Sequence, residues 1–139
     1  MEEQIISFAP QFNLDKVSRT IGDFVFTNER ILFVNTLKGS DILSFFWTSS
    51  PFVRRKKNSK SIQSMHLNEI LQSYSPVKSI KYDELSSIYI KRKIFKSVKI
   101  ILNYKNGKQL KYWGRKKNSE DLIDKLEALK QTGVTIKIN

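Results

Sequence analysis

Residues 98–113, VKIILNYKNGKQLKYW, decide the fold class because they read as two strands joined by a tight turn. Asn106 and Gly107 suit the positive φ angles that short hairpin loops require. A three-residue loop ending at Gly107 sets Leu102 opposite Leu110, whereas a two-residue loop would set Leu102 opposite a lysine. The three-residue loop therefore predicts a hairpin with one apolar face. Its other face mixes lysines and polar residues with one isoleucine and one tryptophan.

A second hairpin is expected at residues 24–35, FVFTNERILFVN, where two apolar runs flank the polar sequence TNER. The Thr-Asn pair at the junction favours a turn, because Asn tolerates left-handed backbone angles and Thr bonds locally. Both strands are apolar on both faces, which indicates burial in a closed sheet. Arg30 begins the return strand, and we expect its guanidinium to bond turn carbonyls or the carboxylate of Asp23 or Glu84.

Other strands are predicted less strongly. A strand is expected at residues 87–92, after a short strand or turn at 80–82, and an extra strand at 134–138, where apolar and polar residues alternate. The first twenty residues show no clean period, so no element is assigned to them.

The strongest helix signal lies at residues 119–132. Ser119 stands at the N-cap position, two acids occupy the first turn, and a glycine follows the last turn. Its leucines and isoleucine form one stripe at helical spacing. A second, short helix is expected within residues 61–76, which belong to an apparent insertion at 40–78.

The order of these elements resembles that of GRAM and bacterial PH-like domains. The matching segments are GDFVFTNERILFV, SIKYDELSSI, VKIILNYKNGKQLKYW and SEDLIDKLEAL, in that order. The resemblance implies a mainly β fold, a bent PH-like β-barrel or sandwich closed by a C-terminal α-helix, with a helical insertion. It also implies a binding or scaffolding module without catalysis, in which residues 1–139 form a single domain. The insertion and the 134–138 strand depart from the family pattern.

Composition narrows the classes of function. The 139 residues suffice for one hydrophobic core, and the chain has no cysteine and one histidine, which disfavours disulfides and metal sites. No apolar run approaches the roughly 18 residues that span a bilayer, and the start is acidic instead of signal-like. We therefore expect a cytoplasmic protein, free or peripheral to a membrane, with no cofactor and no small-molecule substrate. A monomer is favoured.

The net charge of +12 is concentrated in the middle of the chain, where residues 51–119 hold 18 Lys and Arg against 3 Asp and Glu. Such a field attracts anionic lipid surfaces or acidic proteins. A lysine-rich composition also arises from an AT-rich genome without any partner, and this alternative stays open.

The first candidate contact segment joins aromatic and basic residues. It comprises Phe45, Phe46, Trp47, Arg54, Arg55, Lys56, Lys57 and Lys60. Rings at headgroup level and nearby cations suit an anionic membrane surface. The alternative is an ordinary core strand followed by a solvated loop.

Two further basic clusters are candidate anion contacts. They comprise Lys91, Arg92 and Lys93, with Lys96 and Lys99 beside them, and Arg115, Lys116 and Lys117. If the strands bring these clusters together, they form one anion-binding face, although exposed lysines also keep sheet edges from pairing.

Two observations bear on other function classes. Tyr112, Trp113 and Arg115 interleave rings with a cation, which makes sequence-tolerant nucleic-acid binding the alternative function; these rings would otherwise be barrel packing. Asp83 and Glu84 are adjacent and predicted to point apart, which is poor geometry for acid–base catalysis. We expect no enzyme activity and assign no catalytic residue.

Overall fold

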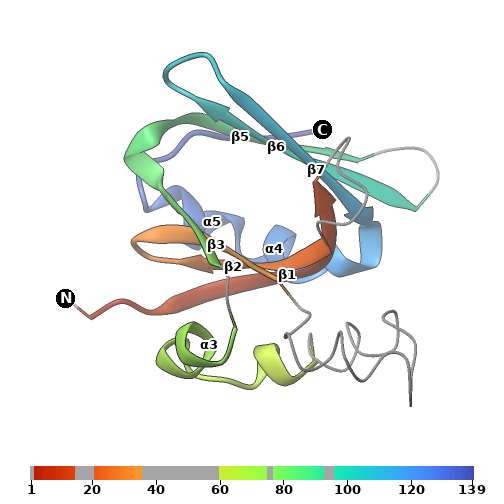
Figure 1. Ribbon diagram of the computed structural model, residues 1–139. Coiled ribbons are helices and arrows are strands. Elements are labelled where there is room, and N and C mark those ends of the chain that lie inside the picture. Colours follow the sequence, from red (N-terminus) through yellow and green to blue (C-terminus); the bar gives the residue numbers. More distant parts are fainter. Residues whose placement is uncertain (1, 15–20, 36–59, 75–76, 93–95) are drawn as a thin grey trace.

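The computed structural model describes residues 2–14, 21–35, 60–74, 77–92 and 96–139 (Figure 1). In these residues eight strands form one sheet, in the order β4-β3-β2-β1-β7-β6-β5-β8. The strands are β1 (Ile5–Leu14), β2 (Ile21–Thr27), β3 (Arg30–Asn35), β4 (Val77–Lys81), β5 (Leu85–Arg92), β6 (Ser97–Tyr104), β7 (Gln109–Arg115) and β8 (Ile136–Ile138). The helices are α3 (Leu67–Ser73), α4 (Glu120–Asp124) and α5 (Leu126–Lys130), with 3₁₀ turns η1 (Tyr82–Glu84) and η2 (Lys116–Ser119).

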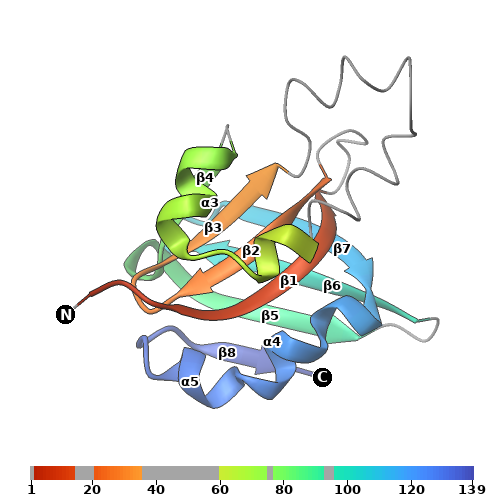
Figure 2. The ribbon, with the colours of Figure 1, turned by 90° about the horizontal axis from the view of Figure 1, so that it is seen from below.

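The sheet folds over on itself to enclose the core. β1 joins its two halves, because it pairs with β2 along most of its length and with β7 only at Asn13 and Leu14. Figure 2 shows α4, α5 and β8 on one side of the molecule and α3 on another, beside β2 and β3. The architecture is mainly β with helices near the carboxyl end, as the sequence predicts.

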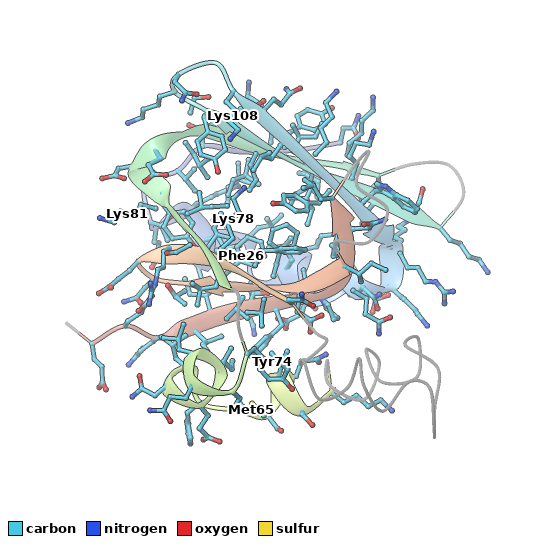
Figure 3. The ribbon with its side chains drawn as sticks, in the orientation of Figure 1. Phe26, Met65, Tyr74, Lys78, Lys81 and Lys108 are labelled. Atoms are coloured by element: carbon cyan, nitrogen blue, oxygen red, sulfur yellow. The ribbon has the colours of Figure 1, made fainter. Side chains whose placement is uncertain are left out.

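Aromatic rings fill the centre of this core. Phe24 contacts the rings of Phe12, Phe26, Phe33 and Tyr112, with centroid distances between 4.7 and 5.6 Å. Figure 3 shows Phe26 between the two halves of the sheet. The register that brings Tyr112 into this cluster is the predicted one: Leu102 pairs with Leu110, and Ile100 pairs with Tyr112. Gly107, with φ of +90°, ends the three-residue loop, so the hairpin prediction is confirmed.

No helix or strand was assigned to the first twenty residues. This was wrong, because β1 occupies Ile5–Leu14. A bulge at Pro10 and Gln11 explains the broken period: Ala9 pairs with Phe24, and Phe12 already pairs with Gly22. Gln11 has a positive φ of 56°, and its N–H donates to the buried Asp23 carboxylate at 3.0 Å. The bend produced here lets β1 reach β7.

The β2–β3 turn is held by Thr27, whose Oγ1 accepts hydrogen bonds from the N–H groups of Glu29 and Arg30 at 3.1 and 3.0 Å. Arg30 has a carboxylate partner, but this is Glu3 and neither Asp23 nor Glu84. Its Nε and Nη2 donate to the two Glu3 oxygens at 2.9 and 3.1 Å. Glu3 lies just before β1, in the stretch where the sequence shows no clean period.

We expect the Glu3–Arg30 pair to add acid-sensitive stability. Burial opposes ionisation of Glu3, but hydrogen bonds from Arg30 and Thr27 and the charge of Arg30 outweigh it, so the Glu3 pKa lies below its usual value. A lowered carboxyl pKa stabilises the fold above the unfolded-state pKa and loses this contribution as pH falls through the folded-state pKa. Glu3→Gln should therefore lower the free energy of unfolding by about 1 kcal/mol at pH 7 and by progressively less below pH 4.5.

Urea unfolding at pH 7 and pH 3 measures this difference. Glu2→Gln is the control, because Glu2 is exposed and we expect it to change stability little at either pH. A Glu3→Gln penalty that stays constant down to pH 3 would contradict the assignment.

The helix expected at 119–132 consists of α4 and α5, which meet at an irregular turn at Lys125. Ser119 does not cap the first turn with its side chain; its hydroxyl donates to the Lys116 carbonyl at 2.7 Å. Leu122 and Leu129 are buried in the core and close one open side of the folded sheet.

The shorter helix expected within 61–76 corresponds to α3 and to a helical turn before it, whose described residues are 60–63. Ile62, Ile70 and Tyr74 are buried against Val25, Leu32 and Val34 on the outer face of β2 and β3. Figure 3 shows Met65 and Tyr74 on this side of the molecule. A helical layer thus covers the outer face of this half of the sheet.

The carboxyl-terminal segment folds back on its own chain. β8 runs parallel to β5, with Ile136 beside Ile88 and Ile138 beside Ile90. The Ile88 N–H donates to the Thr135 carbonyl at 2.8 Å, and Val134 is buried in the core.

Removing residues 134–139 should therefore lower the melting temperature without changing the oligomeric state, because the lost contacts lie within one chain. Burial of one valine alone contributes about 1.5–3 kcal/mol. Thermal unfolding and light scattering test this together. A wild-type dimer that becomes a stable monomer on truncation would show instead that the tail forms an interface.

Candidate functional site

A hollow of about 890 Å³ lies where β1 and β7 end and β6 begins, near η2 and α4. Its lining residues are Gln11, Asn13, Ile21, Lys96, Ser97, Trp113, Gly114, Arg115, Lys116, Lys117, Asn118, Glu120 and Ile123. We call it the corner hollow. Figure 1 shows the surrounding elements at the arrowhead end of β7.

Backbone pairing brings basic residues together around the corner hollow. Ser97 pairs with Arg115 at the ends of β6 and β7, and the Lys116 N–H donates to the Lys96 carbonyl at 2.8 Å. Lys96 thus lies beside Lys116 although about twenty residues separate them in the chain. On the other side β1 passes close to β7: a Cβ on Gly114 would lie 3.1 Å from the Gln11 carbonyl oxygen.

The lining is strongly cationic. Among the described residues it contains four cationic side chains, all exposed, and one carboxylate, that of Glu120. Trp113 is 47% exposed and stands beside these cations. Asn13 contributes a buried Oδ1 that has no hydrogen-bond partner within the described part of the chain. This arrangement can attract an anion and place a ring beside it, while the Asn13 Oδ1 can accept a hydrogen bond from a donor group of the same partner.

Backbone strain also concentrates at the corner hollow. Outside glycine, positive φ angles occur in the described residues at Gln11 (56°) and Lys96 (39°), and both residues line it. Strained backbone conformations cluster at binding sites, where the surrounding structure holds them in place.

The structure unites only some of the predicted contact residues. Arg115, Lys116 and Lys117 line the corner hollow with Lys96, as the hypothesis of a joint face requires. Phe45, Phe46, Trp47, Arg54, Arg55, Lys56, Lys57 and Lys93 lie outside the described residues.

The remaining candidates lie elsewhere. Lys60 is exposed in the turn before α3. Lys91 pairs with Lys99 across β5 and β6, and the Arg92 Nε donates to the Asn139 carbonyl at 2.7 Å.

Sequence reasoning missed the residues that β1 contributes, Gln11 and Asn13. The bulge removes the alternation that would have indicated a strand, and Pro10 next to Gln11 was the sequence signal of a bend. The two candidate stacking rings lie on opposite faces of β7. Tyr112 is 1% exposed in the core, whereas Trp113 projects outward.

Other site types find no support in the described residues. Asp83 and Glu84 lie in η1. Among the described residues, no group of three or more His, Asp or Glu side chains could hold a metal ion. Within the same residues, every helix is too short or too polar to cross a membrane.

Comparisons with known proteins bear on the fold. No family model and no curated protein sequence matches the chain. Among solved structures, the Vps36 N-terminal PH domain is similar, with a TM-score of 0.50 and 12% sequence identity, over 94% of this chain and 80% of that one. The chain has a PH-like fold.

Proposed function

We propose that the chain is a non-catalytic binding module that docks on an anionic membrane surface through the corner hollow. The observation that carries the proposal is the convergence of Lys96 with Arg115, Lys116 and Lys117 around the half-exposed Trp113. Each Lys or Arg near an anionic surface contributes about 1 kcal/mol of attraction. A tryptophan suits the headgroup layer, because its ring is apolar and its N–H is polar.

The proposal extends to two features of the sequence. The aromatic and polybasic segment from Phe45 to Lys57 has the same combination of rings and cations, and we propose that it adds to the membrane contact. The four segments that resemble GRAM domains fit a module of this kind. A binding role without catalysis also agrees with the PH-like fold, and an acidic protein is the other anionic partner that the charge would attract.

Nucleic acid is the second candidate partner for the same surface. The exposed Trp113 beside Arg115 favours it, because a ring can stack on a base while a cation binds the neighbouring phosphate.

Vesicle sedimentation tests the proposal. The chain should sediment with phosphatidylserine-containing vesicles and not with phosphatidylcholine vesicles, and added salt should weaken the binding because it screens the charges. A single-stranded oligonucleotide titration under the same buffer conditions is the comparison. Oligonucleotide binding without vesicle binding would replace the membrane proposal with the nucleic-acid one, and binding to neither would refute both.

A further inference from the structure

The outer face of β5, β6, β7 and β8 carries an apolar stripe with lysines around it. Tyr89, Ile101 and Trp113 form the stripe, one on each of β5, β6 and β7. Tyr89 lies directly opposite Ile101, and Trp113 is diagonal to Ile101, opposite its neighbour Lys99. These positions alternate with core residues, so their side chains project away from the barrel.

Lysines flank the stripe on both sides. Lys91 and Lys99 pair with each other on one side. On the other side Lys111 lies opposite Ile101, and at the β8 end of the stripe Lys137 lies beside Tyr89. The outward positions of these strands, Ser87 to Lys91, Ser97 to Asn103, Gln109 to Arg115 and Lys137, include no carboxylate among the described residues.

The two outer faces of the folded sheet differ. On the half made by β2 and β3, Val25, Leu32 and Val34 are buried under α3 and the turn before it. Figure 1 shows α3 on the side of the barrel away from β5–β7, and none of the described helices lies over the outer face of β5–β7. Trp113, at 47% exposure, is one of the large hydrophobic side chains left exposed there.

We propose that this outer face docks an acidic amphipathic helix of a partner protein, laid across the strands along Tyr89, Ile101 and Trp113. This surface and partner go beyond the membrane contact proposed for the corner hollow. Neighbouring strands lie about 4.8 Å apart, close to the ~5.4 Å pitch of a helix. Apolar residues one turn apart on the helix would therefore meet Tyr89 and Ile101, which are directly opposite each other. Trp113 lies on the diagonal, about 7–8 Å from Ile101, where its large ring extends the stripe.

The placement of charge selects the helix over other anionic partners. A helix with an apolar stripe carries its acids on both flanks, which matches lysines on both sides of Ile101. A single nucleic-acid strand has one phosphate backbone beside its stacked bases, which matches lysines on one side only. A membrane takes its apolar contacts from protruding side chains, whereas Tyr89 and Ile101 are half-buried within the sheet face.

The probe is a designed 18-residue peptide with leucines on one helical face and glutamates on both flanks. A second peptide has the same composition but scattered leucines, and fluorescence anisotropy measures both affinities. Two variants of the chain disturb the face: Lys99→Glu with Lys111→Glu reverses one charge on each side of the stripe, and Ile101→Ser removes its centre. Lys105→Glu with Lys108→Glu, in the exposed β6–β7 loop, is the charge-matched control. Circular dichroism verifies that each variant is folded.

The amphipathic peptide should bind the wild-type chain at least tenfold more tightly than the scattered peptide. The Lys99 and Lys111 double variant should weaken binding at least tenfold and Ile101→Ser about fivefold, while the control changes it less than twofold. Equal losses in both double variants, or equal binding of the two peptides, would show non-specific charge attraction and overturn the proposal. So would an outer-face variant that loses oligonucleotide or vesicle binding but keeps the peptide. Trp113 belongs to both surfaces, but it is unchanged in these variants, as are Arg115, Lys116 and Lys117. A loss confined to peptide binding therefore tests the outer face apart from the corner hollow.

Discussion

Phe24→Ala is expected to lower the free energy of unfolding by about 3–5 kcal/mol, as large-to-small changes of buried aromatic residues do. Phe24 is fully buried, and its ring contacts those of Phe12, Phe26, Phe33 and Tyr112. Those residues come from four strands, so the cavity would lie where the two halves of the sheet meet. Urea unfolding monitored by circular dichroism measures the loss, which is a large share of the about 5–15 kcal/mol that stabilises a typical domain.

Trp113→Ala is the matched control, because it removes a larger ring from a position that is 47% exposed. It should cost clearly less than Phe24→Ala, because about half of the residue stays in water and no closed cavity is left. Equal losses for the two variants would contradict the assignment of Phe24 to the centre of the core.

Gly22→Ala is expected to cost about 3 kcal/mol or more, because added atoms in a close-packed site force the backbone to shift. A Cβ at this position would lie 2.4 Å from the Val34 carbonyl oxygen and 2.9 Å from Cζ of Phe33. The carbonyl belongs to the neighbouring strand β3, and Phe33 is held in the aromatic cluster, so neither can move freely. The same unfolding measurement gives the cost.

Gly107→Ala separates this steric effect from the general cost of replacing glycine. Gly107 has a φ of +90°, but a Cβ there would meet no atom within 4 Å. Its substitution should cost about 1 kcal/mol from backbone strain alone. A larger penalty at Gly107 than at Gly22 would show that β2 and β3 do not approach as closely as described.

Sequence patterns within short segments predicted the two hairpins but missed β1 and its part in the corner hollow. The β6–β7 register followed from Asn106 and Gly107 together with the alternation of apolar residues, because both are encoded within sixteen residues. β1 was missed because its bulge at Gln11 breaks the alternation, and the bulge depends on Asp23 in another strand. Likewise, the Glu3 partner of Arg30 is 27 residues away in the chain, a separation at which spacing carries no signal.

The candidate site was predictable in part. The sequence singled out Arg115, Lys116 and Lys117 as a basic cluster, but their proximity to Lys96 depends on the β6–β7 register and on a backbone hydrogen bond to η2. The outer face was visible as a mixed face of residues 98–113. Its extension across Tyr89 and Lys137 required the pairing of β5 with β8. The contact segment from Phe45 to Lys57 stays a prediction.

Binding of a charge-depleted variant to anionic vesicles tests the central claim most directly. The variant changes Arg115, Lys116 and Lys117 to serine, and a control removes the same charge by changing Lys81, Lys105 and Lys108. The control residues belong to β4 and the β6–β7 loop, and Figure 3 shows Lys81 and Lys108 at the end of the sheet away from the corner hollow. At about 1 kcal/mol for each cation, the first variant should bind phosphatidylserine vesicles about a hundredfold more weakly at low salt, and the control should bind almost as the wild-type chain does. Equal weakening in both variants would show that net charge alone governs binding and would contradict a site at the corner hollow.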